Sequence, residues 1–182
     1  ADVLSEEKKI GMTIDNMPHC GLEVFLGKGL CVVGGEVATR TYVDIEKVIR
    51  NTVLSLGYKD SAVGLNGNSM GVLNAMIPQS PDINIGTRAD KGKYKEIGAG
   101  DQGIMFGYAV AETPELMPAP IHYAHAILRR LAEVRKSGEE PRLGPDAKSQ
   151  LSIRYENGEP VEVSSLVLST QHLDEAMSSA DV

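Results

Sequence analysis

The residues best placed to do chemistry lie in a glycine-rich run at positions 98–109, which reads GAGDQGIMFGYA. It sets one carboxylate, Asp101, among glycines and then continues into a short apolar segment. Because glycine has no Cβ and tolerates positive φ, a ligand can approach the backbone closely at such a run. The composition therefore predicts a ligand-binding loop that carries one acidic side chain.

The same run satisfies the pattern G-x-G-x-x-G, which also occurs in dinucleotide-binding proteins. The pattern is informative only after a strand, at the start of a helix, and with an acidic residue about 20 positions later. Here residues 87–96 are polar and lysine-rich, residues 104–109 look extended, and Tyr123 stands near the position of the acid. A nicotinamide-dependent oxidoreductase is therefore supported by the bare pattern alone.

Further polar side chains stand at predicted turns and strand ends, namely Glu23, Glu36, Gln79, Asp146 and Lys148. Acids and an amide near glycine corners can hold an ammonium-bearing substrate, and a lysine beside an aspartate can meet a phosphate or order a ribose. The same residue types are common at ordinary exposed turns. Spacing alone therefore predicts a small-molecule site and nothing more specific.

Length and charge restrict the classes of function. The 182 residues suffice for one large domain or two small ones, and the net charge of -7 argues against a nucleic-acid partner, which requires clustered Lys and Arg. No stretch approaches the roughly 20 apolar residues of a membrane helix, and no signal peptide is recognisable. Cys20 and Cys31 lack C-x-x-C spacing, so we expect buried thiols and a cytoplasmic, reducing location.

In the first half of the chain, β-branched and aromatic residues flank a glycine turn and predict a hairpin over residues 22–33. Residues 45–56 carry an apolar stripe of helical spacing, with Asp44 as N-cap and Gly57 as C-terminal stop. Met70 belongs to a second apolar stripe that predicts a shorter helix over residues 69–77, with the methionine as core filler.

After Pro78, residues 79–100 have almost nothing to bury and predict a mobile loop, either a lid over a site or a disordered surface insertion. A helix is predicted from residues 117–120 to Lys136, where its first turn tolerates proline. Asn157-Gly158 between alternating runs predicts a hairpin over residues 151–169. His122 and His125 are three residues apart, but without an acidic or cysteine partner we favour surface or packing roles over metal binding.

This element order predicts an α+β fold whose subdomains have mostly antiparallel sheets with helices on one face. At the level of motifs, the chain resembles the S-adenosylmethionine synthetase (methionine adenosyltransferase) family, whose signature hexapeptide GAGDQG stands at residues 98–103. Further segments match in the same order, namely VGGE at 33–36, QSPDIN at 79–84, LMPAPI at 116–121, PDAKSQ at 145–150 and VLSTQH at 167–172.

The resemblance implies synthesis of S-adenosylmethionine from ATP and L-methionine. The methionine sulfur attacks C5′ of the ribose and displaces the triphosphate, which is then split into phosphate and pyrophosphate. By matching position, Glu36, Gln79 and Asp101 would surround methionine, with the acids near its ammonium group. Asp101 and Lys148 would be the catalytic residues of this part of the enzyme.

The ATP and metal contacts are likewise implied by matching position. Asp146 would bind the ribose or adenine end of ATP, Lys148 the phosphate chain, and Ser169 a further part of the nucleotide. Glu23 would help to hold K⁺, and the family also requires Mg²⁺. The complete enzyme would be a homodimer or homotetramer, with neither nucleic acid nor a membrane as a partner.

The family pattern divides the chain into a first subdomain at residues 1–84, an active-site loop at 85–100, and a central subdomain at 101–182, with no third subdomain. The family's opening segment with His-Pro-Asp-Lys is not found before Glu23. We therefore expect a fragment, truncated within the central subdomain, that is inactive alone because one lysine cannot offset the charge of a triphosphate. The alternative is a non-catalytic family member that associates with a full-length synthetase.

Overall fold

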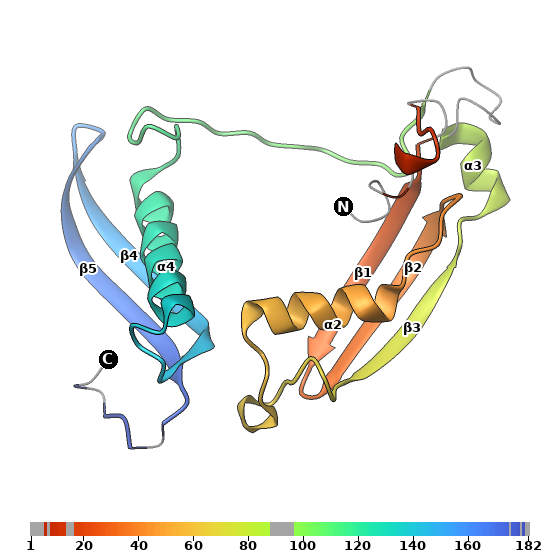
Figure 1. Ribbon diagram of the computed structural model, residues 1–182. Helices are drawn as coiled ribbons and strands as arrows, with labels where there is room; N and C mark the ends of the chain where they lie inside the picture. Colours follow the sequence, from red (N-terminus) through yellow and green to blue (C-terminus); the bar gives the residue numbers. More distant parts are fainter. Residues whose placement is uncertain are drawn as a thin grey trace. The chain divides into compact units, whose positions relative to one another are not determined.

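The chain is organised around two separate sheets, one of three strands in the order β1-β2-β3 and one of two strands, β4 and β5 (Figure 1). The computed structural model describes residues 6, 8–13, 17–87, 97–174, 176–178 and 180. These fall into two units, Ala1–Ile104 and Met105–Val182, each of which is described by itself. Among the described residues, no helix is both long and apolar enough to cross a membrane.

The predicted first hairpin is confirmed and is longer than expected. Strands β1 (His19–Gly27) and β2 (Leu30–Ala38) pair antiparallel from His19↔Ala38 to Gly27↔Leu30. The two-residue turn uses Gly29 at a φ of 64°, a conformation that residues with a Cβ rarely adopt. Cys31 on β2 is buried as predicted, whereas Cys20 on β1 is exposed, because it lies near the open end of an edge strand.

Helix α2 (Ile45–Leu56) forms as predicted, and specific residues satisfy both of its ends. The Asp44 carboxylate accepts a hydrogen bond from the Lys47 backbone N–H at 3.0 Å, and Gly57 ends the helix in the left-handed region at a φ of 104°. The helix buries Val53 against one face of the first sheet, in a core with Cys31, Leu65 and Met70.

The helix predicted over residues 69–77 is wrong, because this segment forms strand β3 (Gly71–Pro78). It pairs parallel with β2, from Leu30↔Gly71 to Val37↔Pro78, and α2 lies in the crossover connection between the two strands. The apolar spacing fits either conformation, but Val72 and Met76 share the face that is partly buried. The backbone hydrogen bonds with β2 therefore determine that this segment is a strand and not a helix. These bonds cannot be inferred from the local sequence.

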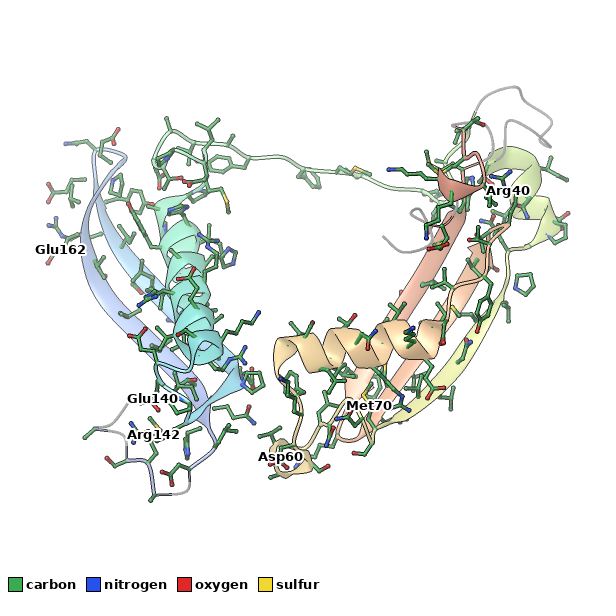
Figure 2. The ribbon with its side chains drawn as sticks, in the orientation of Figure 1. Arg40, Asp60, Met70, Glu140, Arg142 and Glu162 are labelled. Carbon is green, nitrogen blue, oxygen red and sulfur yellow. The ribbon has the colours of Figure 1, made fainter. Side chains whose placement is uncertain are left out.

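The start of β3 is held by a side chain from α2. Arg50 donates from Nη1 to the carbonyl oxygens of Gly67 at 2.9 Å and Met70 at 3.0 Å, while its Nη2 donates to Glu46 at 2.7 Å. Met70, labelled in Figure 2, packs between α2 and the sheet and is only 3% exposed, as expected of a core methionine. These contacts fix where the chain turns into the strand.

The predicted loop over residues 79–100 contains a short helix, α3 (Pro81–Thr87). Its sequence carries a helix-start signal, since proline is tolerated in the first turn and Asp82 follows it. The expectation of a mobile lid concerns mainly residues 88–96, which lie outside the described residues. Residues 104–109, expected to be extended, form no strand, and Met105 and Phe106 are 96% and 94% exposed.

The second unit consists of a helix packed on a hairpin, and both elements are confirmed predictions. Helix α4 (Ala119–Ser137) begins after Pro118 and ends at Gly138. Strands β4 (Leu143–Glu156) and β5 (Glu159–His172) pair antiparallel around Asn157 and Gly158, whose φ angles are 52° and 88°. Figure 2 shows Glu140 and Arg142 together in the connection to β4, where their closest charged atoms are 2.7 Å apart.

Glu112 ties the beginning of α4 to the far end of β4. Its Oε2 accepts hydrogen bonds from the Ala119 backbone N–H at 2.8 Å and from the Tyr155 hydroxyl at 2.7 Å. These two bonds lower the pKa of the Glu112 carboxyl, and the bond to Glu112 raises the pKa of Tyr155 to about 12.

Taken together, the helices and the two sheets confirm the predicted α+β fold class. The parallel β2–β3 pair is a departure from the mostly antiparallel sheet that was expected in the first unit.

Candidate functional site

Three of the predicted site residues line one cavity in the first unit. Glu36, Gln79 and Asp101 surround a space of about 580 Å³, together with Pro18, His19, Cys20, Gly21, Gly35, Ile83 and Gly100. The three residues come from the end of β2, from the residue after β3, and from the glycine-rich run. The cavity therefore collects side chains that are far apart in the sequence.

Glu36 is positioned by the pairing of β2 with strands on both sides. It lies opposite Gly21 of β1 and Ile77 of β3, and it is half-buried. The preceding residue, Gly35, has a φ of 118°, and a Cβ added there would lie less than 3.0 Å from the Gly21 carbonyl oxygen. Only glycine fits this corner, so the closeness of β1 and β2 next to Glu36 depends on it.

Gln79 enters the cavity because its backbone continues the β2–β3 ladder. Its N–H donates to the Val37 carbonyl at 3.1 Å, and its own carbonyl accepts a bond from Asn84 Nδ2 on α3 at 3.4 Å. The side-chain Oε1 of Gln79 and the Oδ1 of Asn84 are both buried, and neither has a hydrogen-bond partner among the described residues. Buried acceptors of this kind are normally satisfied, and because neither oxygen is exposed, a donor from a ligand could reach them only after neighbouring side chains shift.

Asp101 presents a carboxylate with little protein around it. It is exposed, and among the described residues its side-chain contact is a bond of 2.7 Å from the backbone N–H of Gln102 to Oδ1. With Glu36 it places two carboxylates in the wall of one cavity, and the described residues that line this cavity include no lysine or arginine. Such a site favours a cationic group with several N–H donors, as an ammonium has.

The predicted ATP contacts lie in the second unit. Lys148 and Ser169 are direct partners in the antiparallel β4–β5 ladder, so their side chains lie on the same face of the sheet. Ser149, the next residue, donates from its hydroxyl to the Ala124 carbonyl of α4 at 2.8 Å. Lys148 and Ser169 therefore lie on the face away from the helix, and Asp146 precedes them on β4, where all three are exposed.

Glu23 does not line the cavity of Glu36, Gln79 and Asp101. It is an exposed residue of β1 and lines an adjoining hollow, which shares Gly21 and Gly35 with that cavity. Within the described residues, no group of three or more His, Cys, Asp or Glu side chains is arranged to hold a metal ion. His122 lies 3.3 Å from Glu115 and is 15% exposed at its side chain, while His125 is exposed, in keeping with packing and surface roles.

Sequence reasoning missed residues that support the cavity. Asn84 belongs to the segment QSPDIN, yet nothing in its type or spacing pointed to a contact with the Gln79 carbonyl. Cys20 and His19 line the cavity because β1 begins earlier than predicted. After Gly98, described residues 99–110 form no helix, which a dinucleotide site requires at this position.

Two family models match this chain. The model described as the S-adenosylmethionine synthetase N-terminal domain matches residues 8–81, and the model described as the S-adenosylmethionine synthetase central domain matches residues 96–182. The chain belongs to the S-adenosylmethionine synthetase family. The three cavity residues of this S-adenosylmethionine synthetase chain thus fall in the N-terminal match or at the start of the central match.

Sequence comparison with whole proteins agrees with the family models. An S-adenosylmethionine synthase from Myxococcus xanthus strain DK1622, and another from Myxococcus xanthus, are each 50% identical to this synthetase chain over 161 residues. The match covers 88% of this chain and 39% of each relative. The chain therefore spans about two fifths of the length of the curated relatives that it matches.

Proposed function

We propose that this chain forms the methionine-binding part, and a portion of the ATP-binding part, of an enzyme that makes S-adenosylmethionine from ATP and L-methionine. The observation that carries the proposal is the shared cavity of Glu36, Gln79 and Asp101. These are the residues that the family resemblance assigns to methionine, and their chemistry suits an amino acid ammonium group. Family membership supports the reaction class.

In this proposal the chain's own residues bind and orient the nucleophile. Glu36 and Asp101 accept hydrogen bonds from the methionine ammonium, and Gln79 lines the same cavity as a further polar contact. The neutral sulfur must then lie in line with C5′ of ATP and the leaving triphosphate, so positioning accounts for much of the rate. Lys148 contacts the phosphate chain and stabilises the charge that develops on it, with Asp146 and Ser169 as further nucleotide contacts.

The implied cations fit the described residues poorly. S-adenosylmethionine synthetases generally use Mg²⁺ and K⁺. Such hard cations need several oxygen ligands, but Glu23 contributes one exposed carboxylate and no further acid joins it in a cluster among the described residues. No step of the proposed mechanism is therefore assigned to a cation held by these residues.

Binding of L-methionine tests the proposal directly. Calorimetric titration of the 182-residue chain should show saturable binding, and Glu36→Gln or Asp101→Asn should weaken it by about tenfold, because each removes a charge-assisted hydrogen bond. Glu159→Gln, an exposed acid at the start of β5, is the matched control and should leave binding unchanged. Binding that is indifferent to both cavity acids would refute the assignment.

We further propose that the 182 residues alone release no S-adenosylmethionine above background from ATP, methionine, Mg²⁺ and K⁺. The alternative candidate is a non-catalytic family member that assembles with a full-length synthetase. Co-purification of the tagged chain with such a subunit, together with a change in that subunit's activity, would favour the alternative. Product formation by the chain alone at an ordinary enzymatic rate would overturn the expectation of inactivity.

A further inference from the structure

The glycine-rich run packs against the last turn of α3 through its first glycine. A Cβ added to Gly98 would lie less than 3.0 Å from the carbonyl oxygen of Gly86, and 3.3 Å from its carbonyl carbon. Real Cβ atoms do not approach a backbone oxygen so closely, and the oxygen cannot rotate away as a flexible side chain would. Gly98 is therefore required for space at this contact.

The conformation of Gly98 does not by itself call for glycine. The described glycines with positive φ are Gly11, Gly29, Gly35, Gly57, Gly64, Gly138 and Gly158, and none of them belongs to the glycine-rich run. The interpretation that the run uses glycine for unusual backbone angles is thus replaced by one based on close packing. This distinction matters because it predicts which glycines of the run tolerate a methyl group.

The three glycines of the GAGDQG segment differ sharply in their surroundings. Gly98 meets backbone, whereas a Cβ at Gly100 would make an ordinary contact of 3.6 Å with Thr87 Cγ2, and one at Gly103 would have no neighbour within 4 Å. Thr87 forms a firm wall, since it is 2% exposed and its hydroxyl donates to the Ile83 carbonyl at 3.1 Å. The run is therefore fixed at its beginning and open at its end.

Asp101 follows directly after this fixed portion. It lines the cavity with Gln79 and Ile83, yet within the described residues its side chain is bonded to the backbone N–H of Gln102 and to no group across the cavity. The location of its carboxylate relative to Gln79 is therefore set by main-chain packing upstream. We propose that Gly98 is a positioning residue that brings Asp101 into the methionine cavity, because it lets the glycine-rich run pack against the C-terminal end of α3. This inference rests on the proposed function for its ligand, but its structural content is independent of that function.

The test compares alanine at two glycines of one motif. Gly98→Ala should weaken L-methionine binding by about tenfold or more, while Gly103→Ala should stay within about twofold of the unmodified chain. If Gly98 acts through Asp101, the double variant Gly98→Ala with Asp101→Asn should bind no more weakly than Asp101→Asn alone. Additive losses, or equal binding by the two alanine variants, would overturn the proposal.

A second variant covers the case in which Gly98→Ala does not fold, which circular dichroism would reveal. Thr87→Ser removes the Cγ2 that faces Gly100 and keeps the hydroxyl bond to Ile83, so the fold should survive and binding should weaken by about two- to fivefold. If Thr87→Ser instead binds like the unmodified chain, the docking surface does not position Asp101.

Failure of the proposed function can be told apart from failure of this inference. If the unmodified chain does not bind L-methionine, the proposed function fails, and the positioning claim is then read from backbone NMR signals. Gly98→Ala should shift the amide signals of Asp101, Gln102 and Ile83, and Gly103→Ala should leave that of Ile83 in place. Unchanged Asp101 and Ile83 signals in a folded Gly98→Ala variant would overturn the inference whether or not methionine binds.

Discussion

Replacing Gly35 with alanine should separate β1 from β2 beside Glu36. Gly35 has a φ of 118°, a region that is strained for any residue with a Cβ, at a cost of about 1–3 kcal/mol. The added Cβ would also lie less than 3.0 Å from the Gly21 carbonyl oxygen and 3.1 Å from Leu22 Cα, so the two strands must move apart. Loss of one or two ladder hydrogen bonds adds about 1 kcal/mol each.

The expected loss for Gly35→Ala is therefore roughly 2–5 kcal/mol, which is a large share of the stability of a domain of this size. Gly34→Ala is the matched control on the same strand. Its Cβ would meet Ala75 Cβ at 3.6 Å, an ordinary contact, and Gly34 has no positive φ. We expect the control to change the free energy of unfolding by less than about 1 kcal/mol.

Urea unfolding followed by circular dichroism provides the measurement. Because Gly35 belongs to the first unit, its substitution should lower the midpoint of that unit's transition and leave the transition of the α4–hairpin unit in place. Stability equal to that of the Gly34→Ala variant would refute the reasoning. The close approach of β1 to β2 would then not depend on the missing Cβ.

Three further predictions concern other elements. Asp44→Ala should destabilise the first unit by about 1 kcal/mol and Asp44→Asn much less, because the N-cap hydrogen bond is lost only in the alanine variant. The urea unfolding midpoints of the two variants test this difference. Arg50→Lys should destabilise the same unit by about 1–3 kcal/mol, because a lysine ammonium cannot reproduce the guanidinium bonds to the Gly67 and Met70 carbonyls. A urea midpoint equal to that of the unmodified chain would count against this prediction. In alkaline titration one tyrosine should ionise near pH 12, and Tyr155→Phe should remove that step. The raised pKa of Tyr155 belongs to the folded state, so the bond to Glu112 contributes its full stabilisation below pH 10.0. This stabilisation is lost as the pH rises through about 12. Titration of every tyrosine near its usual pKa would contradict the prediction.

Local signals were sufficient for elements whose ends are built from adjacent residues. Helix α2 has its cap at Asp44 and its stop at Gly57, and the second hairpin turns at Asn157 and Gly158. Each of these features depends on a few neighbouring side chains and backbone angles. Such elements can be located from one sequence without knowledge of the tertiary structure.

Strand β3 could not be predicted in this way. Its apolar residues fit a helix as well as a strand, and the choice is made by pairing with β2 and by the Arg50 contacts that fix its start. Helix α3 is short, and its start signal at Pro81 was outweighed by the polar composition of the residues that follow it. The missing information was therefore a partner distant in sequence for β3, and the weight of a local start signal for α3.

The candidate site, like the fold, was predictable from local sequence only in part. Residue types at glycine corners predicted acids and an amide suited to an ammonium group, and the family resemblance selected Glu36, Gln79 and Asp101. Their common cavity depends on the β2–β3 register and on the packing of the glycine-rich run. The contact of Asn84 with the Gln79 carbonyl likewise exists only because α3 folds back on that residue.

The cavity's two carboxylates are positioned by main-chain contacts that leave no room for a Cβ. Glu36 follows Gly35, which faces the Gly21 carbonyl, and Asp101 lies three residues after Gly98, which faces the Gly86 carbonyl. Removing a carboxylate should therefore weaken binding while leaving the fold intact, because the Asp101 side chain is exposed and, among the described residues, bonds to the Gln102 N–H alone. Adding a methyl group at either glycine should instead alter binding through backbone displacement. A ligand site built in this manner is sensitive to mutation both at its carboxylates and at the glycines whose close main-chain contacts position them.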